Sequence, residues 1–243
     1  MLARRVLAEL VGTAFLVAAV IGSGIAAERL SPGDTGLQLL ENAVATAAVL
    51  VAVILAVGPV SGAHLNPVVT VADRLFGGVD TTTAGAYIGA QVAGGALGAV
   101  VANLMFDLPA VEWSTTGRSG DGVWLAEVVA TLGLLLVVFG VVRSGRASVA
   151  PFAVGAYIGS AYFFTSSTSF ANPAVTVART LSDTFAGIEP ASAPAFLLAQ
   201  LVGGALAFAV VRTLYPRTEE SADEVVVPHD ESSLRHRETG SAR

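Results

Sequence analysis

Six long apolar stretches dominate the pattern of hydrophobic and polar positions along the 243-residue chain. They lie near residues 5–27, 38–57, 82–105, 122–142, 148–165 and 192–214. An α-helix needs roughly 20 mostly apolar residues to cross the hydrocarbon core of a bilayer. The pattern therefore predicts an all-α membrane protein with six transmembrane helices.

The second half of the chain repeats the first half. The motifs LAELVGT at 7–13, SGAHLNPVVTVA at 61–72 and QVAGGALGAVV at 91–101 return as LAEVVAT at 125–131, STSFANPAVTVA at 167–178 and QLVGGALAFAV at 200–210. Each half holds three spans, an odd number, so the second half must enter the bilayer from the opposite side. We expect one domain over residues 1–215, built as an inverted repeat of about 1–106 and 121–215.

The arginines predict the orientation of this domain. One face would hold Arg4, Arg5, Arg74, Arg143, Arg146, Arg212 and Arg217, and the other Arg29, Arg118 and Arg179. Because cytoplasmic loops carry an excess of Lys and Arg, we expect both termini in the cytoplasm.

The composition excludes several classes of protein. Hydrophobic residues make up 53% and charged residues 13%, with a mean hydropathy of +0.70, which is too apolar for an ordinary soluble domain. Without cysteine, and with histidine only at His64, His229 and His236, we expect no metal site and no cofactor. Acidic residues gather in 216–243, which predicts a disordered acidic cytoplasmic tail. No basic patch suggests a nucleic-acid partner.

Two short motifs, Asn66-Pro67-Val68 and Asn172-Pro173-Ala174, lie where apolar character continues but a full span does not fit. Asn is a good helix N-cap, and Pro is favoured at the first helical position. Each motif therefore predicts a half-helix that enters the membrane. Their electropositive N-termini would repel cations at mid-membrane, while the asparagine amides donate hydrogen bonds to a neutral solute.

Buried polar residues are expected to support the loops before these motifs. Glu9 and Glu127 occupy matching depths in the first span of each half, where a lone carboxylate needs a partner. We expect them to bond irregular backbone, and His64 to brace its loop.

Small residues recur every four positions on the third and sixth spans. They are Gly85, Gly89 and Ala93, and Ala199, Gly203 and Ala207. Such stripes allow helices to approach closely, so we expect both to pack inside the bundle.

The paired motifs, the preceding SGAHLNP and the matching glutamates resemble the aquaporin and glycerol-facilitator family, the major intrinsic proteins, over residues 1–215. The resemblance implies a homotetramer in the lipid bilayer, each subunit a passive channel for water and small uncharged solutes and not an enzyme. Residues 167–188 are also similar to a bacterial subgroup linked to arsenic resistance, which implies the bacterial inner membrane.

The chain departs from this family at the outer constriction. Most members have arginine where this chain has Val175, and the family's spacing places the other constriction positions at Thr46, Ser160 and Ser169. A slip in alignment would bring Tyr157 or Tyr162 into the ring instead of Ser160. Without arginine or an aromatic residue, we expect a wide pore for glycerol, urea or neutral metalloid hydroxides such as arsenous acid.

Arg179 shares a helix face with Val175, because the two are four residues apart. It would line the outer vestibule, or else cap its helix or pair with Asp183.

A secondary transporter is the main alternative, since transporters also use inverted repeats and broken helices. Apart from Glu9 and Glu127, however, the spans offer no relay of carboxylates or histidines for ion coupling. A formate or nitrite type channel comes third, because it lacks the paired motifs. A purely structural membrane protein would leave vesicle permeability unchanged.

Overall fold

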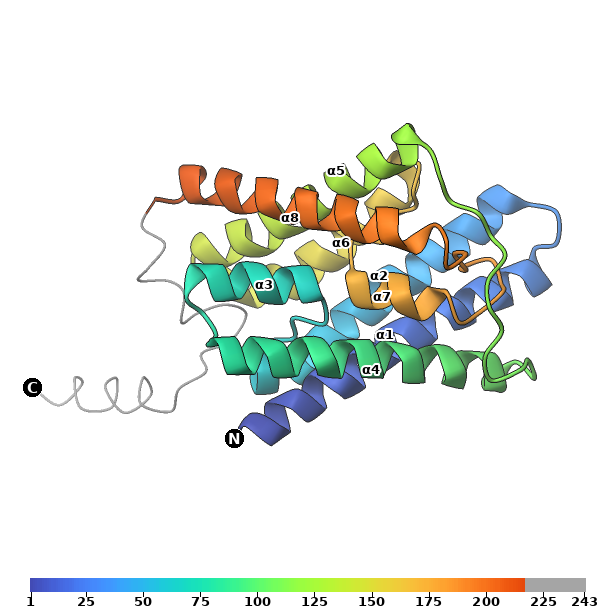
Figure 1. The fold of residues 1–243 in the computed structure, drawn as a ribbon, viewed down its shortest axis with the longest axis horizontal. Coiled ribbons are helices and arrows are strands. Elements are labelled where there is room, and N and C mark those ends of the chain that lie inside the picture. The colour runs from blue at the N-terminus through green and yellow to red at the C-terminus, as the bar shows by residue number, and fades with distance from the viewer. Residues whose placement is uncertain (217–243) are drawn as a thin grey trace, which may run out of the picture.

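The computed structural model describes residues 1–216, which form a bundle of six long helices around two short ones (Figure 1). The long helices are α1 (Leu2–Leu30), α2 (Thr35–Ser61), α4 (Thr81–Met105), α5 (Asp121–Arg143), α6 (Ala150–Phe164) and α8 (Ala193–Leu214). The short ones are α3 (Pro67–Phe76) and α7 (Pro173–Arg179), and a 3-10 turn, η1 (Ala147–Val149), precedes α6. The predicted fold class, six spans plus two half-helices, is confirmed.

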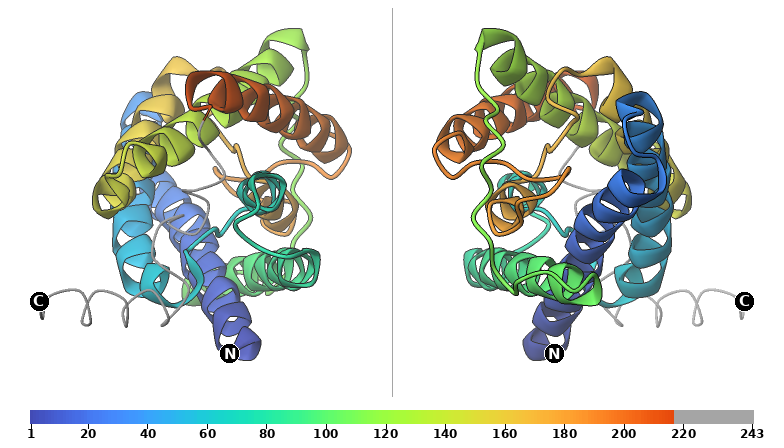
Figure 2. Two further views of the ribbon diagram at one scale, coloured as in Figure 1. Left: turned by 90° about the vertical axis from the view of Figure 1, so that its left-hand side faces the viewer. Right: turned by 90° about the vertical axis from the view of Figure 1, so that its right-hand side faces the viewer.

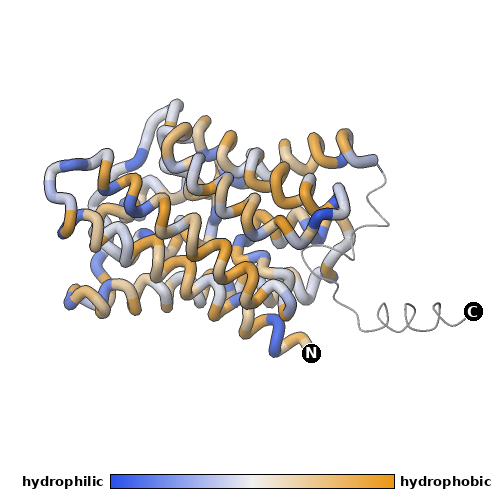
Figure 3. Tube along the Cα trace, turned by 180° about the vertical axis from the view of Figure 1, so that it is seen from behind, coloured by the Kyte–Doolittle hydropathy of each residue, from blue (hydrophilic) through white to orange (hydrophobic). Residues whose placement is uncertain are grey.

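The outside of the bundle is apolar (Figure 3). Five of the long helices, and α6 together with η1 (Ala147–Phe164), are long and hydrophobic enough to cross a membrane. Large side chains such as Phe15, Leu125 and Leu198 are exposed on them, where water would make their exposure costly. The chain is therefore a multi-pass membrane protein.

The two halves use the same packing scheme. In the first half α1 packs against α2 and α4, and in the second half the equivalent α5 packs against α6 and α8. Contacts between α2 and α6 join the halves, and the helices surround α3 and α7 (Figure 2). The beginning of α1 and the end of α8 lie at the same end of the bundle (Figure 1). The predicted acidic tail, apart from residue 216, lies outside the described residues.

Both half-helices begin as their sequences predict. The side chain of Asn66 accepts a hydrogen bond from the backbone N–H of Val68 at 2.9 Å. Asn172 likewise accepts from Ala174 and Val175, at 3.0 and 3.3 Å. The proline after each asparagine is the first helical residue, where its missing N–H costs nothing.

The sixth-span stripe packs as predicted, but the third-span stripe does not. Ala199, Gly203 and Ala207 are buried, and a Cβ on Gly203 would lie 2.5 Å from the Val128 carbonyl of α5.

On α4, by contrast, Gly85, Gly89 and Ala93 are exposed, so the prediction that they pack inside the bundle is wrong. The repeat explains this, because matching Gln91 with Gln200 also matches Gly94 with Gly203. Gly94 is the buried residue, packed against the backbone of Leu10.

Two glycines give a matched test of helix packing. Gly203→Ala is expected to lower the free energy of unfolding by about 1–3 kcal/mol, because the new methyl group meets a backbone carbonyl. Gly122→Ala, near the start of α5, has nothing within 4 Å of its Cβ and should match the wild type or exceed it. Thermal melting in detergent, followed by circular dichroism, measures both, and equal losses would contradict the packing scheme.

Candidate functional site

The two half-helices meet through reciprocal hydrogen bonds. The amide nitrogen of Asn66 donates to the carbonyl oxygen of Ala171 at 2.8 Å, and that of Asn172 donates to Leu65 at 2.8 Å. Each asparagine thus binds the loop that precedes the other one. The N-termini of α3 and α7 are held together, as opposed half-helices require.

The loops before the asparagines have an unusual backbone. Positive φ angles occur at Ala63 (50°), Leu65 (51°), Ser169 (51°) and Ala171 (48°). Residues with a Cβ rarely adopt this left-handed region, which costs free energy unless the surroundings hold it. Thr168 (62°) adds a further such residue to the second loop.

The two buried glutamates supply that support. Glu9 accepts hydrogen bonds from the backbone N–H groups of His64 at 2.9 Å and Leu65 at 2.7 Å. Glu127 accepts from those of Phe170 at 2.8 Å and Ala171 at 2.9 Å. Each carboxylate, itself fully buried, therefore satisfies two loop donors that water cannot reach.

Two glutamines complete the supports, and sequence reasoning missed them. The Gln91 amide donates to Glu9 at 2.7 Å and to Thr70 at 2.9 Å. The Gln200 amide donates to Glu127 at 2.7 Å and to Thr176 at 2.8 Å. The signal was present, because these glutamines open the third repeated motif.

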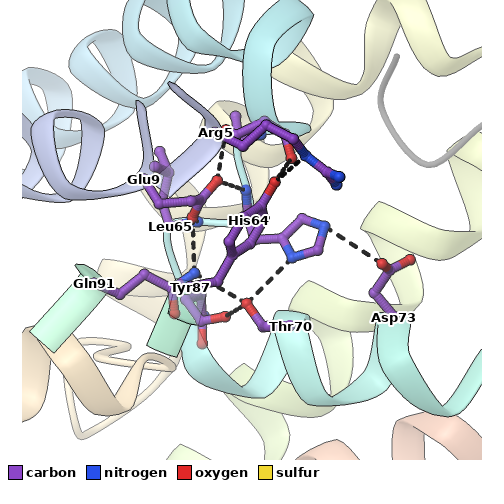
Figure 4. Close-up of polar contacts among 11 residues, drawn as sticks. Arg5, Glu9, His64, Leu65, Thr70, Asp73, Tyr87 and Gln91 are labelled. Carbon is purple, nitrogen blue, oxygen red and sulfur yellow. Dashed lines mark hydrogen bonds and ion pairs between the residues drawn. The ribbon is translucent and has the colours of Figure 1, made fainter. Parts of the chain in front are cut away.

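His64, in the first loop, lies among Thr70, Asp73 and Tyr87 (Figure 4). Its Nδ1 lies 3.2 Å from the Thr70 hydroxyl, and its ring packs edge-on against Tyr87. Its Nε2 lies 3.6 Å from the Asp73 carboxylate. These contacts fit the predicted role of bracing the loop.

A central cavity passes both asparagines. Its polar lining residues are Thr46, His64, Asn66, Tyr162, Ser169, Asn172 and Arg179, and most of its other lining residues are apolar. The apolar lining comprises Leu16, Val20, Leu50, Ile54, Val69, Leu134, Val138, Val154 and Ile158, among others. Of the two motifs, only the asparagines line the cavity, whereas Pro67, Val68, Pro173 and Ala174 do not. The passage is therefore amphipathic along its length.

The structure brings three of the four predicted constriction residues to this cavity. Thr46, Ser169 and Val175 line it, but Ser160 does not. Ser160 is exposed on α6, and its hydroxyl donates to the Tyr157 carbonyl at 2.7 Å. The placement of Ser160 is thereby corrected.

Tyr162, one of the two tyrosines that the sequence left open, lines the cavity instead of Ser160, so the expectation that no aromatic residue belongs to the ring is wrong. The hydroxyl of Tyr162 lies 3.1 Å from that of Thr46. Cavity-lining residues recur every four positions on α6, at Ala150, Val154, Ile158 and Tyr162, and Ser160 is out of phase with them. The other candidate, Tyr157, instead bonds the Ala130 carbonyl of α5 at 3.0 Å.

Arg179 lines the central cavity where a second cavity adjoins it. The residue is only 2% exposed, its Nε donates to the Ala186 carbonyl, and its guanidinium stacks on the ring of Phe170. Asp183 does not pair with it, since the one ion pair within residues 1–216 joins His64 and Asp73.

A second cavity, which we call the outer cavity, opens beyond Arg179. It is lined by Arg179 together with Glu28, Thr35, Leu39, Asn42, Thr116, Arg118, Thr168, Asp183, Thr184 and Phe185. Arg118 donates to the carbonyls of Gly187 at 2.8 Å and Phe185 at 3.2 Å. Burial lowers the pKa of its guanidinium from the usual value. Across residues 1–216, no three His, Asp or Glu side chains gather in a way that would hold a metal ion.

Comparisons with known proteins agree with this geometry. The model of the major intrinsic protein family matches residues 1–171. Aquaglyceroporin AqpS of Rhizobium meliloti (strain 1021) is 47% identical over 213 residues, which cover 88% of this chain and 91% of that protein. The probable aquaporin NIP7-1 of Arabidopsis thaliana is 37% identical over 129 residues, 53% of this chain and 46% of that protein.

A solved structure shares the fold. The X-ray structure of the aquaglyceroporin from Plasmodium falciparum aligns with a TM-score of 0.68 at 19% identity, covering 90% of this chain and all of that one.

The glutamate supports give a direct prediction. Glu127→Leu leaves two buried backbone N–H groups without an acceptor, at a cost of about 1–3 kcal/mol for each. We expect a lower melting temperature and loss of flux in proteoliposomes. The exposed Glu112→Leu serves as a control and should change neither. Wild-type melting and flux in the Glu127 variant would show that the loop holds its shape unaided.

Proposed function

Because the chain belongs to the major intrinsic protein family, and is thus a passive channel for water and small solutes such as glycerol and not an enzyme, we propose that it is a wide-pore member. Its further solutes would be urea and neutral metalloid hydroxides such as arsenous acid. The observation that carries this proposal is Val175, which lines the cavity where most of the family places arginine. A smaller, uncharged side chain leaves more room for a solute.

We assign the central barrier to Asn66 and Asn172. Each side-chain amide has two N–H groups, of which one binds the opposite loop and one is left for a passing solute. The N-termini of α3 and α7 add partial positive charge at the same point. A neutral solute is thereby hydrogen-bonded while a cation is repelled.

The amphipathic wall suits a solute with two different sides. Asparagine amides and Ser169 line the passage together with apolar side chains such as Leu50 and Val138. A polyol can turn its hydroxyls to the polar groups and its carbon atoms to the apolar ones. Few polar groups in a largely apolar lining are typical of sites for small molecules.

The proposed constriction consists of Thr46, Tyr162, Ser169 and Val175. The hydroxyls of Thr46 and Tyr162 bond each other at 3.1 Å, so part of the ring's hydrogen-bonding capacity is already used. Ser169 and Val175 add little further donor strength. Such a ring would select weakly for water over larger neutral solutes.

We further propose that the channel is a homotetramer in the bacterial inner membrane, with both termini cytoplasmic. The orientation is supported by the arginines, and by α1 and α8, which begin and end at the same end of the bundle (Figure 1). Exposed small residues on α4, such as Gly85 and Gly89, would allow a neighbouring subunit to approach closely.

The two buried glutamates of the described chain, Glu9 and Glu127, do not offer a site for ion-coupled transport. Coupling needs a group that binds the ion and then releases it. Glu9 and Glu127 are both committed to backbone and glutamine donors, and neither lines the central cavity. Solute flux that does not change when a proton gradient is imposed would support a passive channel over a coupled transporter.

The wide pore is tested by Val175→Arg in proteoliposomes, using stopped-flow light scattering. We expect the wild type to conduct water, glycerol, urea and arsenous acid. The variant should lose about tenfold in glycerol and arsenous acid flux, equivalent to about 1.4 kcal/mol on the barrier, and less in water flux. Val175→Leu, which adds bulk without charge, should lose less. Exclusion of glycerol and arsenous acid by the wild type would end the wide-pore proposal.

A further inference from the structure

Arg179 is the one residue common to the linings of the central and outer cavities. As the last residue of α7 it lies one turn, about 5.4 Å, beyond Val175 on the same helix face. Arg179 therefore borders both cavities, and a solute that crosses from one to the other would come close to its guanidinium.

The side chain is held in one orientation. Its Cζ lies 3.4 Å from the centre of the Phe170 ring, which makes it a face-on cation–π contact. The Nε donates to the Ala186 carbonyl, and Phe170 is itself fixed by its backbone bond to Glu127. The last turn of a helix also favours a cation. The hydrogen bond thus fixes Nε, and the contact with Phe170 fixes the plane of the guanidinium group.

The outer end of the fork is unpaired. Within residues 1–216, the bond from Nε to Ala186 is the only hydrogen bond that the Arg179 side chain makes, so its two terminal amino groups have no partner. These amino groups are not among the buried polar atoms that lack a hydrogen-bond partner, so they keep a small accessible surface although the residue as a whole is only 2% exposed.

Nearby carboxylates are engaged elsewhere. Glu28 accepts from the Phe185 N–H at 3.0 Å, and Asp183 accepts from the Thr115 N–H at 2.8 Å. Both line the outer cavity, and neither forms an ion pair with Arg179 in the described chain. Within residues 1–216, the central cavity has no carboxylate in its lining and no other Arg or Lys, so Arg179 is the one permanently charged side chain that lines it, while Arg118 adds a second guanidinium to the outer cavity.

We propose that Arg179 is a specificity-determining residue of the outer mouth. Its charge excludes small cations, and its free amino groups donate hydrogen bonds to the hydroxyls of entering polyols. Size selection at Val175 and charge selection at Arg179 are thus separated by one helical turn. Only the solute class in this inference rests on the proposed function, because cation exclusion applies to any channel of this geometry.

Urea and guanidinium provide a matched pair of probes, since they are similar in shape and size but differ in charge. In proteoliposomes, Arg179→Met should raise the guanidinium-to-urea flux ratio several-fold and lower the glycerol-to-urea ratio. Arg179→Lys keeps the charge but loses the planar fork. It should therefore still exclude guanidinium while its glycerol-to-urea ratio falls.

A double variant, Val175→Arg with Arg179→Val, moves the guanidinium inward by one turn. We expect it to restore guanidinium exclusion but to lower glycerol flux, since the charge now occupies the narrow ring. Arg29→Met removes an exposed arginine that lines neither cavity, and it should leave both flux ratios unchanged.

A purely structural Arg179 would give a different result. Its loss would lower the melting temperature and all fluxes in proportion, with both ratios unchanged, and that outcome would overturn the inference. If Arg179→Met fails to fold, the flux ratios of Arg179→Lys and of the double variant still test the role of Arg179.

If the wild type excludes urea, the wide-pore proposal alone fails. The proton leak of the same vesicles then tests whether the charge of Arg179 excludes cations, and it should rise in Arg179→Met.

Discussion

The structure depends on satisfying loop backbone that lies deep in the membrane. Peptide N–H groups cannot be left without acceptors in hydrocarbon, yet a channel needs polar backbone beside its passage. Glu9 and Glu127 resolve this conflict because their carboxylates accept hydrogen bonds from the backbone N–H groups of the two loops. The loops can then adopt left-handed backbone and place their asparagines beside the cavity.

Because the repeat is inverted, the same glutamate-supported loop and half-helix occur once from each side, and together they line a passage through the membrane. Each half supplies a glutamate, a glutamine, a threonine and an asparagine with the same connections, as the bonds of Gln91 and Gln200 show. The halves differ mainly where they face the two sides of the membrane. His64 and Asp73 belong to the first loop and its half-helix, and Phe170 and Arg179 to the second.

Local signals in the sequence predicted much of the fold and part of the site. Helix capping by Asn66 and Asn172, the six apolar helices and the burial of the two glutamates depend on short-range pattern, and the structure shows each of them. Helix phase was harder to predict. Ser160 and Gly85 were misplaced because one or two residues of rotation decide which face points inward, and only packing between distant segments fixes that rotation. The partners of Arg179 likewise depend on the fold, since Phe170 and Ala186 reach it through loop geometry.

The reciprocal bonds of the asparagines also constrain how the protein is made. Asn66 needs Ala171, and Asn172 needs Leu65, so partners 105 and 107 residues apart must both be present. At about 5–20 residues per second, a ribosome needs on the order of 5 to 20 s to synthesise the intervening chain. During that interval the first half-helix is already made but has no opposing loop. The nascent first half therefore has to be sheltered, by lipid, translocon or chaperone, until the second half arrives.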